Sequence, residues 1–419
     1  MQQHESARGR STIPNPPISF GDTGAAEKWS AMEQHMGHPL LQSLRGIRQG
    51  TLRVYLPDGS EVFYLGANPG YHANMRFADW KTLDRIAVEG EIALGEEYAA
   101  GRWDTTDLRK LLRVVAQNGG VFDRSPATPR LSRLARFARR KIFAGGGRKS
   151  LHPPHSLGND FYSLWLGKTM SFSGGLFNGD AGIPLEEAQR ATYRRALGRL
   201  GTQKGEHILD LGCGFGGFMD EAARLGVHAT GVTLEAEQAA FAQERLAGFA
   251  GLADIKLDDY RRVKGTFDDI VSFGTFETVG EARWPDFMEC VFRNLRPGGR
   301  AVIQTTVVAD DHSDAYARSV DFAREHIAPG SFVPSRRGLE QAARRAGLQI
   351  NDIYHFGRDQ AITFDSWFER FTAAEPKLRD LGYPEALLLK WAFHLANRAA
   401  QFETRRLDMI QVEFSRPRH

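Results

Sequence analysis

Apolar and polar positions follow two different periods in the first third of the chain. Residues 45–65, RGIRQGTLRVYLPDGSEVFYL, alternate apolar and polar side chains around a Pro-Asp-Gly turn, which predicts a β-hairpin. Residues 84–118 repeat their apolar positions at helical spacing, so helices are expected there, the last one capped by Thr105 or Thr106. These segments predict a small N-terminal α/β domain over residues 41–128.

From residue 186 the pattern becomes an alternation of helices and short buried strands. LEEAQRATYRRALGRL predicts a helix, and strands are expected in HILDLGC, HATGVTL, ADIKLDD, FDDIVSFGTF and RAVIQTTVV. This alternation predicts a doubly wound, mostly parallel, Rossmann-like α/β sheet with ligands at the carboxyl ends of its strands. We assign it to a second domain, residues 151–419.

Two other segments lack a core-forming pattern. Residues 1–40 hold several prolines and little apolar content, which predicts a mobile tail. Residues 129–150 contain RLSRLARFARRKIFAGGGRKS, a basic amphipathic linker without an acidic residue. It reads either as a solvated linker or as a surface for anionic phospholipid headgroups. No nucleic-acid motif accompanies it, so nucleic acid is not an expected partner.

Composition narrows the cellular setting. The chain has 419 residues, a formal net charge of +3 and only two cysteines, Cys213 and Cys290, which suits a reducing, cytoplasmic compartment. No apolar run reaches the roughly 18 residues that span a bilayer, so we expect membrane contact to be peripheral, at the inner face. His312 and His326 lack partners at metal-ligand spacing, and no metal site is expected.

The stretch ILDLGCGFGGF carries the clearest chemistry, because a strand runs directly into a glycine loop and a helix. Gly212 and Gly214 let the backbone approach a ligand closely, and Asp210 lies at the strand end. An aspartate here suits a methionine-derived cofactor, which has no pyrophosphate to bind, so S-adenosylmethionine fits better than NAD. Asp258 or Asp259, after the third strand, is expected near the adenine.

Several stretches resemble the cyclopropane-fatty-acyl-phospholipid synthase family, the relatives of the mycolic acid methyltransferases. They are GEIALGEEYAAGRWDTTDL, LGNDFYSLWLGKTMSFS, GVTLEAEQ, FDDIVSFGTFETVG and FETRRLDMIQVEFSR, and the similarity covers nearly everything after residue 45. The resemblance implies a seven-stranded methyltransferase sheet and methyl transfer from S-adenosylmethionine to the double bond of an unsaturated phospholipid acyl chain, with bicarbonate removing a proton. It also implies a homodimer formed through the N-terminal domain.

The resemblance also assigns site residues. Those implied as cofactor contacts are Phe172, Ser173, Asp210, Gly212, Gly214, Thr233, Leu234, Gln238 and Asp258. Glu277 corresponds to the acid that helps to hold bicarbonate, while Gln304 and Gln360 stand where the family has a histidine and a tyrosine.

The chain departs from the family at the bicarbonate pocket. Gly174 replaces a cysteine, so three of the four side chains that grip bicarbonate are changed, and the role of bicarbonate becomes doubtful. We expect Gly174 to open space and Glu277 to be the best remaining base. A methyl-branched or methylene product is slightly favoured over a cyclopropane. The alternatives are a methyltransferase of a non-lipid small molecule and a non-catalytic lipid- or cofactor-binding homologue.

Overall fold

The computed structural model describes residues 37–119, 121 and 157–418. The predicted linker at 129–150, and the predicted tail up to residue 36, lie outside the described residues. The described chain divides into two compact units. The first comprises 37–121, 320–327 and 379–404, and the second comprises 157–319, 328–378 and 405–418.

The first unit contains a four-stranded sheet in the order β2-β1-β3-β4. Its strands are β1 (Gln49–Tyr55), β2 (Glu61–Leu65), β3 (Asn68–Phe77) and β4 (Trp103–Asp104). The predicted hairpin is confirmed, because β1 and β2 pair antiparallel and the Asp58 carboxylate accepts the Ser60 N–H at 2.9 Å within the turn. β3, which pairs parallel with β1, was not predicted.

Helices complete the first unit. They are α2 (Pro39–Leu44), α3 (Trp80–Glu89), α4 (Glu91–Ala99), α5 (Leu108–Gln117), α14 (Phe322–His326) and α17 (Glu385–Glu403). The predicted cap of α5 is wrong. Asp107 caps the helix, since its carboxylate accepts the Lys110 N–H at 3.1 Å, whereas the Thr105 hydroxyl accepts the Asp107 N–H.

The division into units departs from the predicted boundary at residue 151. Residues 320–327 and 379–404 belong to the first unit because their helices find their apolar partners there. Helix α17 packs against α4 and α5, and Phe322 of α14 lies against Phe393 with ring centroids 4.7 Å apart. The chain therefore leaves the second unit twice before its last strand.

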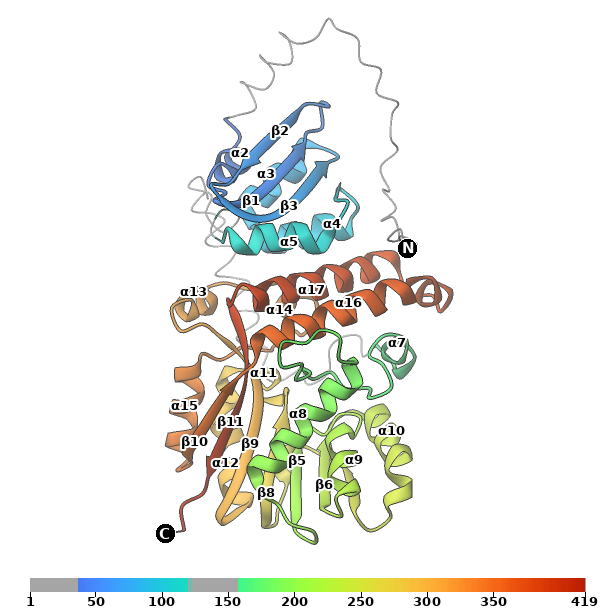
Figure 1. The fold of residues 1–419 in the computed structure, drawn as a ribbon, viewed down its shortest axis with the longest axis vertical. Coiled ribbons are helices and arrows are strands. Elements are labelled where there is room, and N and C mark those ends of the chain that lie inside the picture. Colours follow the sequence, from blue (N-terminus) through green and yellow to red (C-terminus); the bar gives the residue numbers. More distant parts are fainter. Residues whose placement is uncertain (1–36, 120, 122–156, 419) are drawn as a thin grey trace, which may run out of the picture. The chain divides into compact units, whose positions relative to one another are not determined.

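The second unit is built on a seven-stranded sheet, which confirms the predicted fold class (Figure 1). The strand order is β10-β11-β9-β8-β5-β6-β7. These strands are β5 (His207–Leu211), β6 (His228–Thr233), β7 (Ala253–Leu257), β8 (Phe267–Phe273), β9 (Leu295–Val308), β10 (Gln349–His355) and β11 (Leu407–Ser415). Only β11 runs against its neighbours β9 and β10. The carboxyl ends of β5 to β9 consequently meet at one edge.

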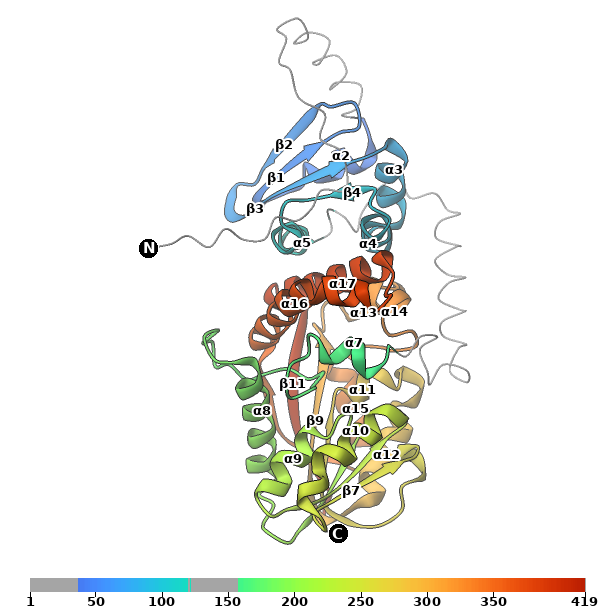
Figure 2. The ribbon, with the colours of Figure 1, turned by 90° about the vertical axis from the view of Figure 1, so that its right-hand side faces the viewer.

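Helices cover both faces of this sheet (Figure 2). The apolar core under α8 and α9 uses side chains such as Ile208 and Val302, and the core under α12 and α15 uses their neighbours Leu209 and Ile303. The helices of this unit are α7 (Asn159–Ser163), α8 (Leu185–Leu200), α9 (Gly217–Arg224), α10 (Ala236–Leu246), α11 (Thr275–Thr278), α12 (Trp284–Asn294), α13 (Ser313–Arg318), α15 (Arg336–Arg345) and most of α16 (Gly357–Asp380). Short 3₁₀ turns lie at Ala247–Phe249, Tyr260–Arg262 and Glu281–Arg283.

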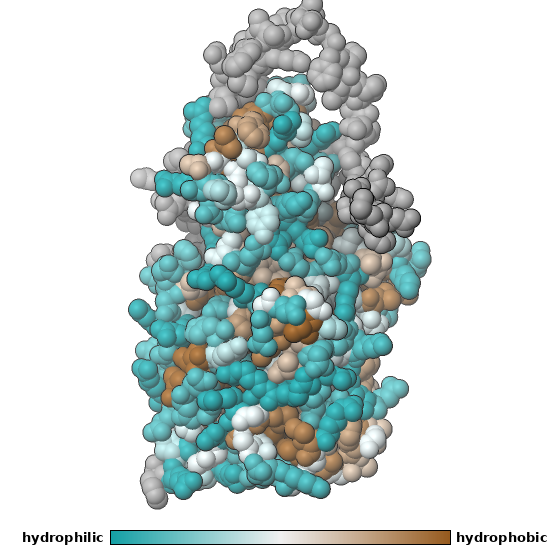
Figure 3. All heavy atoms as spheres, in the orientation of Figure 1, coloured by the Kyte–Doolittle hydropathy of each residue, from teal (hydrophilic) through white to brown (hydrophobic). Residues whose placement is uncertain are grey.

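The surface is mainly hydrophilic on the face drawn in Figure 3, with separate apolar patches between polar side chains. Scattered apolar exposure of this kind is ordinary for a folded protein. Among the described residues, every helix is too short or too polar to cross a bilayer.

Candidate functional site

The candidate cofactor residues gather where β5, β6 and β7 end. Asp210 is the penultimate residue of β5, Thr233 ends β6, and Asp258 follows β7. These three strands are adjacent and parallel, so their carboxyl ends lie along the same edge of the sheet. The structure thus brings together groups that are separated by about one helix each in the sequence.

Asp210 is the most unusual side chain at this edge. It is 1 % exposed, and its Oδ1 has no hydrogen-bond partner within the described part of the chain. Burial raises the pKa of its carboxyl to about 8. A buried carboxylate without a partner is costly, so Asp210 suits a ligand that supplies hydrogen-bond donors or positive charge.

The glycine loop after Asp210 leaves room for such a ligand. Gly212 and Gly214 both have positive φ, +83° and +53°. A Cβ on Gly214 would meet nothing within 4 Å, so the loop borders open space, whereas a Cβ on Gly212 would collide with Thr275 Oγ1. The open side of the loop and the lone carboxyl of Asp210 fit S-adenosylmethionine, whose methionine part carries an ammonium group.

The second strand contributes a small polar cluster. The Thr233 hydroxyl donates to Gln238 Oε1 at 3.1 Å and accepts the Glu235 N–H at 3.2 Å. Leu234, partly exposed, lies between β6 and α10, and Gln238 is in the first turn region of α10. This hydrogen bond holds the side chains of Thr233 and Gln238, both predicted cofactor residues, against each other.

The structure separates the two acidic candidates after β7. Asp259 is buried and ion-paired with Arg261, which holds the pKa of its carboxyl below the ordinary value. Asp258 is 42 % exposed and accepts the Asp259 N–H at 2.7 Å, with Arg262 at 3.6 Å. Asp258 is therefore the one whose carboxylate faces solvent and stays accessible to a ligand.

The loop that carries Phe172 and Ser173 is held by side chains from three elements of the second unit, β9, α8 and α16. Ser173 is buried, and its hydroxyl accepts a hydrogen bond from Gln304 Nε2 at 2.7 Å. Phe172 is 48 % exposed and stacks on Trp367, with centroids 5.1 Å apart and planes 10° apart. The loop thus presents one fixed hydroxyl and one exposed aromatic ring.

Further along this loop, polar side chains bind its backbone. The Asp359 carboxylate on α16 accepts the N–H groups of 177, 178 and 179 at 2.8, 2.8 and 3.2 Å. Thr363 accepts the Gly175 N–H, and Thr192 on α8 donates to the Gly174 carbonyl, both at 3.0 Å. None of these anchors was predicted from the sequence, although Asp359 and Thr363 lie beside the predicted Gln360.

Glu277 lies on α11, immediately after β8. Its carboxylate accepts hydrogen bonds from the Thr305 hydroxyl and, at 3.4 Å, from the Thr306 N–H of β9. Burial raises the pKa of Glu277 above its ordinary value, while the Thr305 hydrogen bond opposes the rise. The carboxylate is therefore a stronger base than a solvated glutamate, and it is bound to β9 through Thr305 and Thr306.

The structure corrects the prediction that Gly174 opens space. A Cβ on Gly174 would lie 1.8 Å from Gln360 Oε1 and 3.0 Å from Gln360 Cδ. The Gln360 side chain occupies the position that a cysteine would need, so the two substitutions are coupled. Gln360 is 3 % exposed, and its Oε1 has no hydrogen-bond partner among the described residues.

The sequence analysis also missed Gln411. It is a buried amide in the middle of β11, and its Nε2 donates to Gln304 Oε1 at 2.9 Å. A glutamine between Ile410 and Val412 in the strand LDMIQVEF is the signal that could have identified it.

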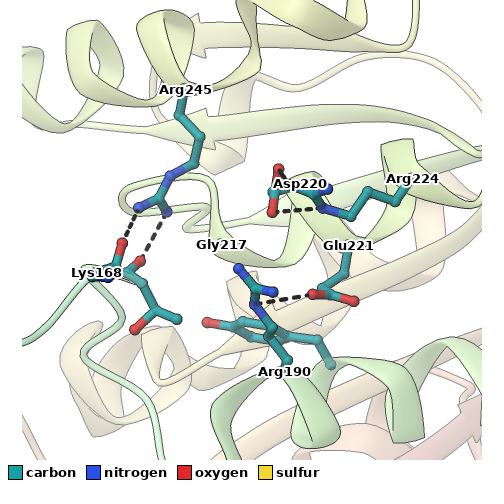
Figure 4. Close-up of a pocket in the computed structure, with 9 residues that line it drawn as sticks. Lys168, Arg190, Gly217, Asp220, Glu221, Arg224 and Arg245 are labelled. Carbon is teal, nitrogen blue, oxygen red and sulfur yellow. Dashed lines mark hydrogen bonds and ion pairs between the residues drawn. The ribbon is translucent and has the colours of Figure 1, made fainter. Parts of the chain in front are cut away.

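A separate cavity of about 230 Å³ lies near the start of α9 (Figure 4). It is lined by Lys168, Thr169, Arg190, Tyr193, Gly217, Asp220, Glu221, Arg224 and Arg245. No predicted site residue lines it. Its guanidinium groups already have partners: Arg190 contacts Glu221, Arg224 contacts Asp220, and Arg245 donates to backbone carbonyls. We assign this cavity no part in the candidate site.

The fold and the site together define a class. A doubly wound sheet with a reversed last strand, a glycine loop after β5 and an unpartnered carboxyl at its end are the features of a Rossmann-like methyltransferase that uses S-adenosylmethionine. The family model described as mycolic acid cyclopropane synthetase matches residues 131–412. The chain belongs to this family, which confirms the resemblance, and it is an S-adenosylmethionine-dependent methyltransferase.

Individual relatives agree with this assignment. The chain is 31 % identical over 340 residues to tuberculostearic acid methyltransferase UfaA1 of Mycobacterium tuberculosis, covering 78 % of this chain and 79 % of that one. It is 31 % identical over 358 residues to cyclopropane-fatty-acyl-phospholipid synthase of Escherichia coli, covering 84 % and 90 %. The mycolic acid cyclopropane synthase CmaA1, solved with SAH and CTAB, has a TM-score of 0.58 and 28 % identity, covering 61 % of this chain and 94 % of its own.

Proposed function

We propose that this methyltransferase acts on the carbon–carbon double bond of an unsaturated phospholipid acyl chain. Two relatives support a fatty acyl substrate by name, one as a tuberculostearic acid methyltransferase and one as a cyclopropane-fatty-acyl-phospholipid synthase. The observation that carries the proposal is the partly buried carboxyl of Glu277, whose pKa is raised and which is bound to Thr305, the residue after Gln304 on β9.

The proposed reaction needs little from the protein except placement and a base. When bound, S-adenosylmethionine supplies an electrophilic methyl group. An alkene that accepts it is left with a positively charged chain carbon, and a proton must then leave. Glu277 is suited to take that proton, because burial raises the pKa of its carboxyl and Thr305 fixes its direction.

The coupled pair Gly174 and Gln360 supports a particular product. The Gln360 amide oxygen fills the position of the family's cysteine, and an amide is a far weaker base than bicarbonate. Without bicarbonate above the new methyl group, proton loss from a chain carbon becomes the easier step. We propose a methyl-branched acyl chain that keeps a double bond as the product, in preference to a cyclopropane. A methylene chain is the other product in this proposal, formed if a hydride first shifts along the chain to the cation and the proton then leaves the transferred methyl group.

Isotope counting tests the product directly. Purified protein is incubated with S-adenosylmethionine bearing a CD₃ group and vesicles of monounsaturated phosphatidylglycerol, and the acyl esters are analysed by mass spectrometry and NMR. Proton loss from the chain leaves three deuterons on a methyl branch. Two deuterons with alkene resonances identify a methylene product, and two deuterons with cyclopropane resonances overturn the product assignment. Cofactor turnover with no labelled lipid would point instead to a non-lipid substrate.

The location of the substrate leads to a second part of the proposal. We infer peripheral association with an anionic membrane surface, because a phospholipid acyl chain must be reached from the bilayer and the segment 129–150 is basic. Co-sedimentation with phosphatidylglycerol vesicles, and not with phosphatidylcholine vesicles, is the expected result. Equal recovery with both would contradict it. The homodimer stays a prediction that size-exclusion chromatography with light scattering can test.

A further inference from the structure

Two buried glutamines face each other in the centre of the second unit's sheet. Gln304 of β9 and Gln411 of β11 are register partners in the antiparallel pair, and they are 2 % and 1 % exposed. Buried amides are costly unless they are hydrogen-bonded, and these two bond to each other at 2.9 Å. A pair of polar side chains in this apolar layer needs a reason beyond packing.

The neighbours of Gln411 fix which way its amide points. Arg195 Nη1 lies 2.8 Å from one end, and a guanidinium can only donate, so that end must be the oxygen. The Thr192 carbonyl lies 3.1 Å from the other end and can only accept, so that end must be the nitrogen. Gln411 therefore donates from Nε2 to Gln304 Oε1.

The orientation of the Gln411 amide determines the orientation of the Gln304 amide, which in turn determines the hydrogen-bonding role of Ser173. Because Gln304 Oε1 accepts from Gln411, its Nε2 is the end that faces Ser173 Oγ, at 2.7 Å. The serine oxygen is thus an acceptor, and its hydrogen is left to donate elsewhere. Among the described residues, no group accepts that hydrogen.

We propose that Gln411 is a positioning residue that makes Ser173 a hydrogen-bond donor toward the cofactor. The inference rests on the proposed contact between Ser173 and S-adenosylmethionine. Arg195 anchors the arrangement at the far end, since its guanidinium lies 3.3 Å from Asp352 and 4.0 Å above the Tyr354 ring. Ser173 is further fixed by Gln189, which donates to its carbonyl at 3.1 Å.

A near-isosteric substitution of Gln411 reverses the direction of the hydrogen bonds between Gln411, Gln304 and Ser173. In Gln411→Glu the carboxylate still accepts from Arg195 but cannot donate to Gln304. The Gln304 amide then turns to donate to Glu, its oxygen faces Ser173, and the serine hydrogen is drawn away from the cofactor. The affinity for S-adenosylhomocysteine, measured by isothermal titration calorimetry, is expected to fall roughly tenfold, as loss of a charge-assisted hydrogen bond does.

A double-mutant cycle separates this effect from general damage. In a Ser173→Ala background, Gln411→Glu should change the affinity less than about twofold, because the group that it acts through is gone. An equal loss in both backgrounds, or no loss in either, would overturn the proposal. The matched control is Gln349→Glu on β10, where an exposed glutamine takes the same charge, and affinity should not change.

A second variant covers the case in which Gln411→Glu does not fold. Gln304→Glu accepts from both Gln411 and Ser173, so it also captures the serine hydrogen, and the same dependence on Ser173 is expected. A loss that is independent of Ser173 would contradict the proposal. Because the ligand is S-adenosylhomocysteine alone, a failure of lipid methylation would leave this test unaffected.

Discussion

The two walls of the candidate site satisfy their polar groups in opposite ways. On the cofactor wall, Asp210 is buried with an unpartnered oxygen, and Gly214 borders open space. On the reaction wall, Ser173, Gln304 and Glu277 are each hydrogen-bonded by the protein. We expect a ligand to complete the first wall. The fold completes the second wall except at Gln360 Oε1 and the Ser173 hydrogen, which have no partner among the described residues. A group left unpaired at a cost to stability is therefore a better sign of binding than a group that is well connected.

The largest expected effect lies on the reaction wall. Glu277→Gln removes the proposed base and should lower kcat by roughly 10²–10⁴-fold, with S-adenosylhomocysteine affinity within about twofold of wild type. Turnover is measured with labelled cofactor and unsaturated vesicles, and binding by calorimetry. Thr305→Val is the matched control: it keeps the carboxylate, but loss of the hydroxyl raises the pKa of Glu277, so the acidic limb of the pH–rate profile should move to higher pH. A Glu277→Gln enzyme with normal kcat would remove Glu277 from the mechanism.

The cofactor wall should respond in binding instead. Asp210→Asn keeps the shape but cannot carry negative charge, so affinity for S-adenosylhomocysteine should fall roughly 10- to 100-fold. Calorimetric titration at pH 7.5 measures the change. Unaltered affinity would mean that Asp210 does not meet the cofactor, and the contrast between the two walls would be lost.

Asp210 should also make the cofactor-free protein sensitive to pH. Its pKa rises from 3.8 to about 8, so the folded state keeps a proton that the unfolded chain releases. This contribution to stability is complete below pH 3.8 and is lost as the pH rises from 3.8 to about 8. By pH 7 the loss in the free energy of unfolding is about 1–4 kcal/mol. In Asp210→Asn the group does not titrate, so the variant should gain stability relative to wild type between pH 5 and pH 8. Chemical denaturation of both proteins across this range measures the difference, and a constant offset would contradict the assignment.

The smallest effect tests the coupled pair. Gly174→Ala places a methyl group against Gln360 Oε1 and should destabilise the protein by about 1–3 kcal/mol. Adding Gln360→Ala removes the clash, so the double variant should lose less than the sum of the single losses in urea denaturation. Gly198→Ala on α8 is the control, because its Cβ meets nothing within 4 Å and helix propensity favours alanine. Strict additivity would show that Gly174 and Gln360 are independent.

Local patterns predicted the sheet and the cofactor wall. The order of strands and helices from residue 186, and the sequence of Asp210, Gly212 and Gly214, depend on neighbours in the chain, which periodicity and motifs report well. The strand β3, NPGYHANMRF, was not predicted because it carries proline, glycine and few apolar positions. The roles of these cofactor residues remain predictions until they are tested.

The reaction wall depends on distant residues, and the sequence could not report it. Gln360 lies against Gly174, and Gln411 bonds to Gln304, over separations of more than a hundred residues. From the sequence alone, a glycine in place of a cysteine at position 174 predicts an open space. Only the fold identifies the side chain that fills that space, because it is delivered by α16, an element with no local connection to the loop.

The helix α17 has a consequence for how this catalytic unit could be separated from its neighbour. It has twelve buried residues and packs against α4 and α5 of the first unit, yet it stands in the chain between α16 and β11, and β11 carries Gln411. A single cut before α7 would therefore leave a catalytic fragment with a stranded apolar helix and a tendency to aggregate. A minimal version of the second unit would need residues 320–327 and 379–404 each replaced by a short linker.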